Sequence, residues 1–261
     1  MRVGIQSIEI GTAVLRALVQ APGPLQLRDV AQAAHMPPSK TYKYLVSLTD
    51  VGLVRQDEAS GRYDLGPFAL ELGLAALGRI DEIDIVAAGL GQITAELQRD
   101  AEITTWGAAG PTVIRWKQGS RNVSIRVKEG SILPVLTSAT GCVWACYLPK
   151  AQTERLIEAE LDVLVERTGQ KREALQSFYD KKIADVRRRG LASAEGELRS
   201  GIDALAGPVF GPSGLAFVMT MLAPHHDTDL SHDGAIANRF RDILQKTSDQ
   251  LGAALNAGDQ A

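Results

Sequence analysis

The chain has 261 residues, of which 45% are hydrophobic and 23% charged, as in a folded globular protein, and its length suits two domains. No apolar run is long enough to cross a membrane, and two cysteines are too few for a disulfide framework. Since no signal peptide follows Met1, we expect a cytoplasmic protein. Because the formal net charge is −3, binding to nucleic acid would require a local patch of basic residues.

The first 65 residues have the pattern of a winged helix-turn-helix. Apolar spacing predicts helices over 6–20 and 26–34, and Pro37-Pro38 begins a third helix that ends near Gly52. Two short extended segments follow, joined by a turn-rich stretch, and predict a hairpin. We expect the third helix to bury Tyr42, Leu45, Val46 and Leu48 or their neighbours.

Residues 66–79 form a separate segment that links the two halves of the chain. Its first twelve residues are almost wholly apolar and carry one charge, and they are too few to span a bilayer. A helix of this composition must bury its surface, so we expect a linker helix that also packs in a dimer.

Residues 80–261 mix helices and strands without regular alternation, which indicates an α+β domain. The predicted helices are 82–98, 139–148, 151–159, 171–189 and 235–256, and the predicted strands are 103–108, 112–118, 122–127, 204–210 and 215–222. The last two strands flank a Gly-Pro-Ser-Gly turn typical of a hairpin.

The third helix carries the residues that favour DNA binding. Its first half would enter the major groove, where it needs donors and acceptors for base edges and phosphates. No acidic residue occurs between Ala31 and Thr49, and one of Tyr42 and Tyr44 could belong to the core instead. Taken singly, each basic residue is also explained as solvated surface. The candidate DNA contacts are Ser39, Lys40, Thr41, Lys43 and Tyr44 on the helix, with Arg55 and Arg62 on the wing.

Five stretches resemble the IclR family of bacterial transcriptional regulators over almost the whole chain. They are SIEIGTAVLRAL, LRDVAQAAHMPPSKTYKYLVSLTDVGLV, GRYDLGPFALELGLAAL, LPVLTSATG and GIDALAGPVFGPSGLAFVMTM. The resemblance implies a winged helix-turn-helix, a dimerising linker helix and a C-terminal GAF-like domain that binds a small effector. It also implies a homodimer or homotetramer that binds double-stranded operator DNA and represses or activates catabolic genes, without a cofactor.

The expected effector pocket lies beside residues 137–141, where three hydroxyl side chains stand at a helix start. Unpaired backbone N–H groups and the helix dipole favour an anion at such a position, although N-capping by Ser138 explains the hydroxyls equally well. By resemblance, the pocket-lining residues are Ser138, Ala139, Thr140, Ala204, Thr220 and Leu222, with Glu195 as a looser match.

This pocket departs from the family pattern at three positions. Cys142 stands where a Lys is usual, Ala204 where some relatives carry Cys, and Leu222 where some carry a hydroxyl. Since the pocket is less polar than one built for a two- or three-carbon acid, we expect an aromatic or otherwise larger carboxylate as the effector.

Three other groups of residues have alternative interpretations. Cys142 and Cys146 lie one helical turn apart and could make a redox sensor or an enzyme, or simply fill the core. The tryptophans Trp106, Trp116 and Trp144 suit a core or a pocket wall. Residues 225–233 could hold a metal or form a polar loop; their candidate ligands are His225, His226, His232, Asp227, Asp229 and Asp233. No catalytic motif is recognisable, so we expect no enzyme; a DNA-binding protein with an empty second domain is a further alternative.

Overall fold

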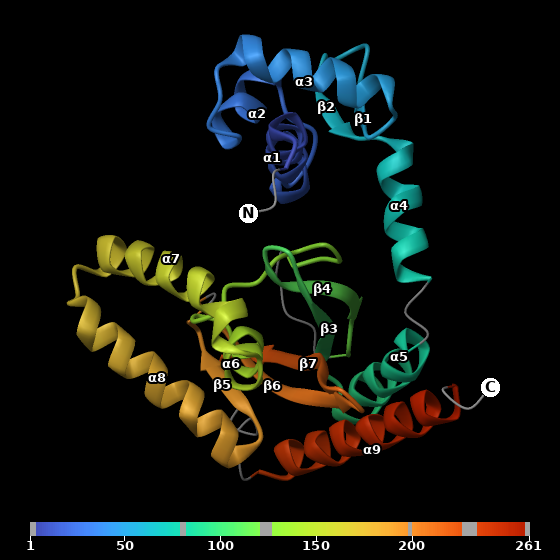
Figure 1. The fold of residues 1–261 in the computed structure, drawn as a ribbon. Coiled ribbons are helices and arrows are strands. Elements are labelled where there is room, and N and C mark those ends of the chain that lie inside the picture. The colour runs from blue at the N-terminus through green and yellow to red at the C-terminus, as the bar shows by residue number, and fades with distance from the viewer. Residues whose placement is uncertain (1–3, 79–81, 121–126, 198–199, 226–233, 259–261) are drawn as a thin grey trace. The chain divides into compact units, whose positions relative to one another are not determined.

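The computed structural model describes residues 4–78, 82–120, 127–197, 200–225 and 234–258 (Figure 1). The chain divides into two compact units, Met1–Asp81 and Glu82–Ala261, which are treated separately below.

The first unit contains a helix-turn-helix followed by a hairpin and one further helix. Its elements are α1 (Gln6–Gln20), α2 (Leu27–Ala33), α3 (Pro38–Asp50), β1 (Val54–Gln56), β2 (Tyr63–Leu65) and α4 (Pro67–Leu77). Proline occupies the first position of both α3 and α4, where its missing N–H costs no helical hydrogen bond. Gly52 adopts a left-handed φ of 74° after α3, and it turns the chain into the antiparallel hairpin.

One side of α3 packs into the core of this unit. Leu45 is fully buried there with Val14, Val30, Val54 and Tyr63. The expectation that Tyr42 and Val46 are buried is wrong, since they are 50% and 41% exposed. The helix is rotated so that positions 41 and 45, four residues apart, share the inner face.

Helix α4 buries none of its residues within the chain. Phe68, Leu70, Leu72 and Leu74 are each at least 42% exposed. A contiguous apolar surface of this kind is typical of a protein interface. The proposal that α4 packs in a dimer is therefore compatible with its exposure and stays a prediction.

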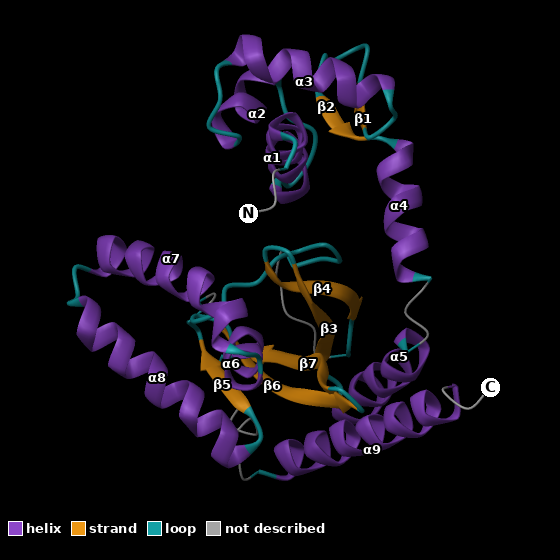
Figure 2. Ribbon diagram, viewed as in Figure 1, coloured by secondary structure: helices purple, strands orange, loops and turns teal. Residues whose placement is uncertain are grey.

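The second unit is built around a five-stranded antiparallel sheet with the order β4-β3-β7-β6-β5. The strands are β3 (Asp100–Gly107), β4 (Gly110–Lys117), β5 (Ala192–Glu195), β6 (Ile202–Gly211) and β7 (Gly214–Pro224). Helices α5 (Ile83–Gln92) and α9 (Ala235–Gly258) lie on one side of this sheet, and α6 (Ala139–Tyr147), α7 (Lys150–Thr168) and α8 (Arg172–Arg189) lie on the other (Figures 1 and 2). The unit thus has three layers.

Several bounds differ from those expected. The helix expected over 82–98 is α5 followed by a π-helical turn, η1 (Ile93–Leu97). Strand β5 was not expected. Helix α7 extends nine residues beyond 159, where the predicted helix ends. Of the strand expected at 122–127, residues 122–126 lie outside the described part of the chain.

Candidate DNA-binding surface and effector pocket

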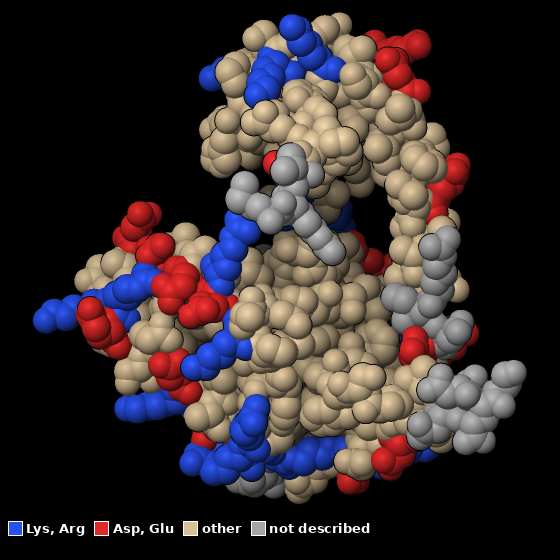
Figure 3. Space-filling view, viewed as in Figure 1, with Lys and Arg blue, Asp and Glu red and all other residues tan. Residues whose placement is uncertain are grey.

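The first half of α3 presents an exposed basic surface. Ser39, Lys40 and Lys43 are exposed, and neither lysine forms an ion pair with any described residue. In the space-filling view, Lys and Arg atoms gather over the end of the first unit that carries α3 (Figure 3). Free ammonium groups of this kind suit contacts with phosphates, which dominate the affinity of proteins for DNA.

Thr41 does not belong to this surface, which corrects the sequence-based expectation. Its side chain is fully buried and its Oγ1 donates a hydrogen bond to the Pro37 carbonyl oxygen at 3.1 Å. Tyr44 is half-buried against the core, whereas Tyr42 is 50% exposed, so Tyr42 is the tyrosine that faces outward. The exposed polar residues on the first half of α3 are therefore Ser39, Lys40, Tyr42 and Lys43.

The two arginines of the wing are exposed but already make contacts. Arg55 forms a salt bridge with Asp64 at 3.0 Å and keeps 67% of its side chain exposed. Arg62 donates from Nη1 to the Pro24 carbonyl oxygen at 3.1 Å. Asp57 and Glu58 are also exposed at the hairpin turn, so the wing has mixed charge.

The second unit contains a cavity between α6 and the sheet. Its interior volume is about 20 Å³, room for about one water molecule, so the cavity is nearly closed in this structure. Six of the seven residues expected at the effector pocket line it: Ser138, Ala139, Thr140, Ala204, Thr220 and Leu222. The other lining residues are Glu102, Val127, Leu133, Ala194 and Ile202.

Glu195 is the expected residue that does not line the cavity. It follows Ala194 on β5, and successive side chains on a strand point to opposite faces of the sheet. Ala194 is buried and faces the cavity, whereas Glu195 is exposed. Glu195 is therefore not a lining residue of this cavity, which corrects the sequence-based expectation.

Hydrogen bonds fix the start of α6 at the edge of this cavity. Ser138 caps the helix: its Oγ accepts from the Gly141 N–H at 2.8 Å and donates to the Pro134 carbonyl oxygen at 2.6 Å. Glu160 on α7 accepts from the N–H groups of Val135 and Leu136 and holds the preceding segment. The cap predicted from the sequence is thus present, and the first-turn N–H groups that it does not use remain at the helix end.

Glu102 is a pocket residue that the sequence analysis missed. It lies on β3 opposite Thr220 of β7 and is only 2% exposed. Thr140 donates from Oγ1 to Glu102 Oε1 at 3.2 Å, and the Thr140 and Thr220 hydroxyls are 2.7 Å apart. Burial raises the pKa of Glu102 to about 7, although the hydrogen bond from Thr140 acts in the opposite direction. The strand was expected to begin at residue 103, so Glu102 was not placed in the sheet.

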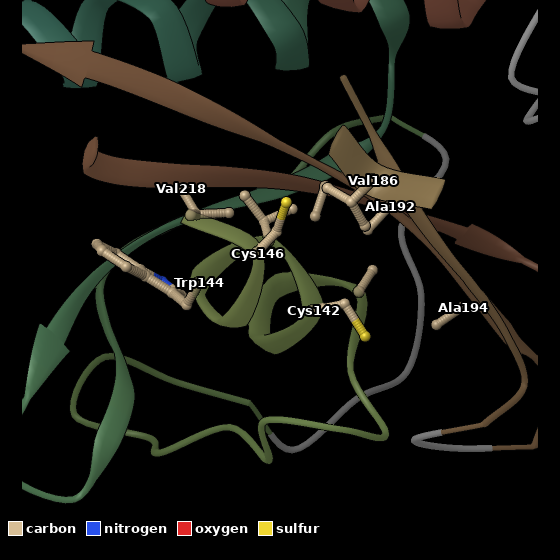
Figure 4. Close-up of a cluster of buried hydrophobic side chains, with 10 residues drawn as sticks. Cys142, Trp144, Cys146, Val186, Ala192, Ala194 and Val218 are labelled. Carbon is tan, nitrogen blue, oxygen red and sulfur yellow. The ribbon is translucent and has the colours of Figure 1, made fainter. Parts of the chain in front are cut away.

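The two cysteines lie in the apolar core around α6 (Figure 4). Both are free and buried, and the Cys142 thiol donates to the Leu136 carbonyl oxygen at 3.3 Å. Burial raises the pKa of Cys142 to about 12, which removes the thiolate that redox chemistry requires. The geometry therefore favours the interpretation of these cysteines as core residues.

The remaining alternatives concern tryptophans and histidines. Trp144 is buried in the same core, stacks at a tilt on Trp106 with 5.8 Å between ring centroids, and donates to Thr104 at 3.0 Å. His225 contacts Asp203 at 2.7 Å, and residues 226–233 of the suspected metal cluster lie outside the described residues. Within the described ranges, no helix is both long and apolar enough to cross a membrane.

An exposed basic recognition helix with a wing, joined in one chain to a domain with a lined cavity, defines a helix-turn-helix regulator with a ligand-binding domain. Residues 7–58 match the IclR helix-turn-helix domain and residues 75–253 match the C-terminal domain of the bacterial transcriptional regulator IclR. The chain belongs to the IclR family, whose members are transcriptional regulators and not enzymes.

Known proteins of this family are similar over most of their length. The HTH-type transcriptional regulator XynR of Escherichia coli K12 is 27% identical and covers 96% of this chain and 97% of its own. The crystal structure of Pseudomonas aeruginosa HmgR is 32% identical, with a TM-score of 0.68. The match covers 95% of this chain and 100% of the HmgR chain. A Microbacterium hydrocarbonoxydans homologue complexed with 4-hydroxybenzoate is 14% identical, with a TM-score of 0.70, and covers 96% and 99%.

Proposed function

We propose that this protein regulates catabolic genes in the cytoplasm and that a small aromatic carboxylate, bound in the cavity beside α6, changes its affinity for operator DNA. The observation that carries this proposal is the cavity itself, which combines apolar walls with the capped start of a helix. The lining side chains would have to move apart to admit an aromatic ring, which would then bury its surface against Leu133, Ile202 and Leu222. The carboxylate would suit the first-turn N–H groups of α6.

On the DNA side, we propose that Ser39, Lys40 and Lys43 reach the major groove, with Tyr42 at the edge of the contact. Their exposure on the first half of α3 supports this placement. Arg55 and Arg62 would contact phosphates from the wing, where Arg55 exchanges its salt bridge with Asp64 for a phosphate.

We further propose that the protein acts as a homodimer, or as a homotetramer built from such dimers, through α4. The exposed leucines of this helix would become buried against a second copy. A two-fold dimer would place two α3 helices in successive major grooves of a nearly palindromic operator. The effector could then act by favouring one arrangement of the two DNA-binding units, to the extent that it binds one arrangement more tightly.

The proposed effector class follows from the polarity of the cavity wall. With Ala204 and Leu222 in its wall, the cavity offers few polar groups to a two- or three-carbon acid. The 4-hydroxybenzoate bound by the Microbacterium hydrocarbonoxydans homologue makes this compound a suitable first probe.

Calorimetry on the full-length protein tests this effector class with benzoate, 4-hydroxybenzoate, pyruvate and glyoxylate. We expect the two benzoates to bind and the two keto acids to bind weakly, and the benzoates to change the affinity for an operator found by genomic footprinting. Ala204→Leu should fill the cavity and weaken benzoate binding at least about tenfold, whereas Glu195→Gln, outside the cavity, should not. Binding of the keto acids alone, or full affinity in Ala204→Leu, would overturn the proposal.

A further inference from the structure

We propose that Glu102 selects the effector by accepting a hydrogen bond from a hydroxyl or amino group of the ligand. The pocket would then prefer an aromatic acid that carries such a donor over the same acid without it. This inference rests on the proposed function, because it takes the cavity beside α6 as the effector pocket.

Glu102 has one carboxylate oxygen in use and one available. Oε1 accepts the hydrogen bond from Thr140, whereas Oε2 has no hydrogen-bond partner among the described residues. The side chain is 2% exposed and lines the cavity, so Oε2 can be reached from the cavity. A ligand that donates to this oxygen would take the place of a water molecule there.

The hydroxyl groups of the cavity cannot serve as donors to the effector, because each already uses its single proton. When Glu102 is ionised, Thr140 donates to it, so in the 2.7 Å contact between the two threonines the Thr220 hydroxyl is the donor. Ser138 donates to the Pro134 carbonyl oxygen. The lining side chains in the described part of the chain therefore offer hydrogen-bond acceptors to a ligand, and the best of them is the carboxylate of Glu102.

The charges around the cavity agree with this assignment. Glu102 is the only ionisable side chain among the described residues that line it, and it accepts from the Thr140 hydroxyl of α6, which in turn contacts the Thr220 hydroxyl of β7. Burial raises its pKa by removing water from the charged form, whereas the hydrogen bond from Thr140 lowers it, and a ligand hydroxyl or amine would add a second hydrogen bond that favours the charged form. A ligand carboxylate placed directly against Glu102 would instead meet a like charge. The ligand carboxylate would therefore bind the first-turn N–H groups of α6.

The test compares matched ligands on one protein. Calorimetry at a pH above 8, where the Glu102 carboxyl is ionised, and at fixed salt would measure benzoate, 3-hydroxybenzoate, 4-hydroxybenzoate and 4-aminobenzoate on the full-length wild-type chain. A site that pairs a buried acceptor with a ligand hydroxyl discriminates strongly against an analogue without the hydroxyl. We expect at least one donor-bearing acid to bind about tenfold or more tightly than benzoate.

Three variants identify the residue responsible for this preference. Glu102→Leu removes the acceptor and should bring the matched ligands to within about twofold of one another; Glu102→Gln, which keeps the shape, should reduce the preference severalfold. Glu195→Gln removes the same charge from the exposed face of β5 and should keep the full preference.

The possible outcomes separate this inference from the proposed function. Equal affinity of the wild type for all four acids, or an undiminished preference in Glu102→Leu, would overturn the role of Glu102 alone. If none of the four acids bound the wild type at millimolar concentration, the aromatic effector class itself would be wrong, and the inference with it.

Discussion

The two units differ in where they keep their polar functional groups. In the first unit, Lys40 and Lys43 stand exposed on α3 above an apolar core. In the second, Glu102, Thr140 and Thr220 are each at most 2% exposed and bond to one another inside the sheet domain. A surface that meets a highly charged polymer needs free ammonium groups, whereas a pocket for a small molecule needs groups that the fold itself has already oriented.

This difference has a consequence for substitutions. An exposed lysine can be removed with little effect on folding, because its side chain contributes mainly to binding. A buried carboxylate or a tightly packed glycine contributes to binding and to stability at once, because its neighbours lose or gain a contact when it changes. The four predictions below probe this contrast, beginning with the largest expected effect.

The largest effect should come from a glycine in each unit that lies against backbone. A Cβ at Gly66 would overlap the Gly52 carbonyl oxygen, and one at Gly141 would overlap the carbonyl oxygens of Pro134 and Val135. Since backbone atoms cannot move aside as a side chain can, we expect Gly66→Ala and Gly141→Ala each to lower the free energy of unfolding by about 3 kcal/mol or more. Chemical denaturation measures both.

The same two variants test whether the two units lose their binding functions separately. Gly66→Ala should impair DNA binding before ligand binding, and Gly141→Ala should do the reverse, because each changes one unit. Gly23→Ala and Gly252→Ala are matched controls, since a Cβ at either position meets nothing within 4 Å. If the packed and open positions gave equal losses of stability, the close approach inferred for Gly66 and Gly141 would be wrong.

The second prediction concerns the dependence of stability on pH. The pKa of Glu102 is about 7 in the folded protein and near 4.5 in an unfolded chain. Between pH 4.5 and pH 7 the Glu102 carboxyl of the folded protein keeps a proton that the unfolded chain releases. The stability that this bound proton contributes is complete below pH 4.5 and is lost as the pH rises to 7. Glu102→Gln avoids the loss and should be more stable than the wild type above that pH by about 3 kcal/mol.

Denaturation of the wild type and Glu102→Gln at several pH values measures this difference. The two curves should converge as the pH falls toward 4.5, where the wild-type carboxyl is neutral when folded. Glu195→Gln provides the control, because its carboxylate is exposed and its removal should give no comparable gain. A constant difference across the range would contradict the burial of an ionisable carboxyl at this position.

The sequence predicted the first unit well because local signals mark its elements. Pro37 and Pro38 stop one helix and start the next, and Gly52 ends α3. It could not decide which side of a thirteen-residue helix faces inward, because α3 has both polar and apolar residues on each side. Thr41 was therefore placed on the DNA-facing surface, although its hydroxyl is satisfied within the helix and its methyl packs inside.

The second unit was harder to predict because its site depends on contacts between distant parts of the chain. The resemblance identified Thr140 and Thr220, but Glu102 joins them only through the pairing of β3 with β7 and the packing of α6. Strand β5 reads Ala-Ser-Ala-Glu and lacks the β-branched alternation that indicates a strand. Its pairing with β6 decides that Ala194 faces the cavity and Glu195 does not.

The third prediction concerns the exposed cations of the first unit. Lys43→Ala and Arg62→Ala should each weaken operator binding about tenfold at fixed salt, and each should lower the slope of log affinity against log salt by about one. The melting temperature of Lys43→Ala should stay close to that of the wild type, because Lys43 forms no ion pair with a described residue. Fluorescence anisotropy with an operator duplex provides both the affinity and the slope.

A charge-matched control separates specific contacts from overall charge. Lys246 is exposed on α9 in the second unit, so Lys246→Ala removes the same charge from a surface assigned no contact with DNA. Retained affinity in both Lys43→Ala and Arg62→Ala, or an equal loss in Lys246→Ala, would refute the placement of the DNA-binding surface on α3 and the wing.

The smallest expected effect belongs to the thiols of the second unit, Cys142 and Cys146, which are both buried in the apolar core around α6. With its pKa near 12, about one Cys142 side chain in ten thousand is a thiolate at pH 8, and only the thiolate reacts. We therefore expect iodoacetamide to label neither cysteine of the folded protein within the time that labels both in urea, and treated protein to keep its response to 4-hydroxybenzoate. Rapid labelling of the folded protein with loss of that response would restore the redox-sensor alternative. It would also show that α6 opens far more often than its packing against Val186, Ala192 and Val218 allows.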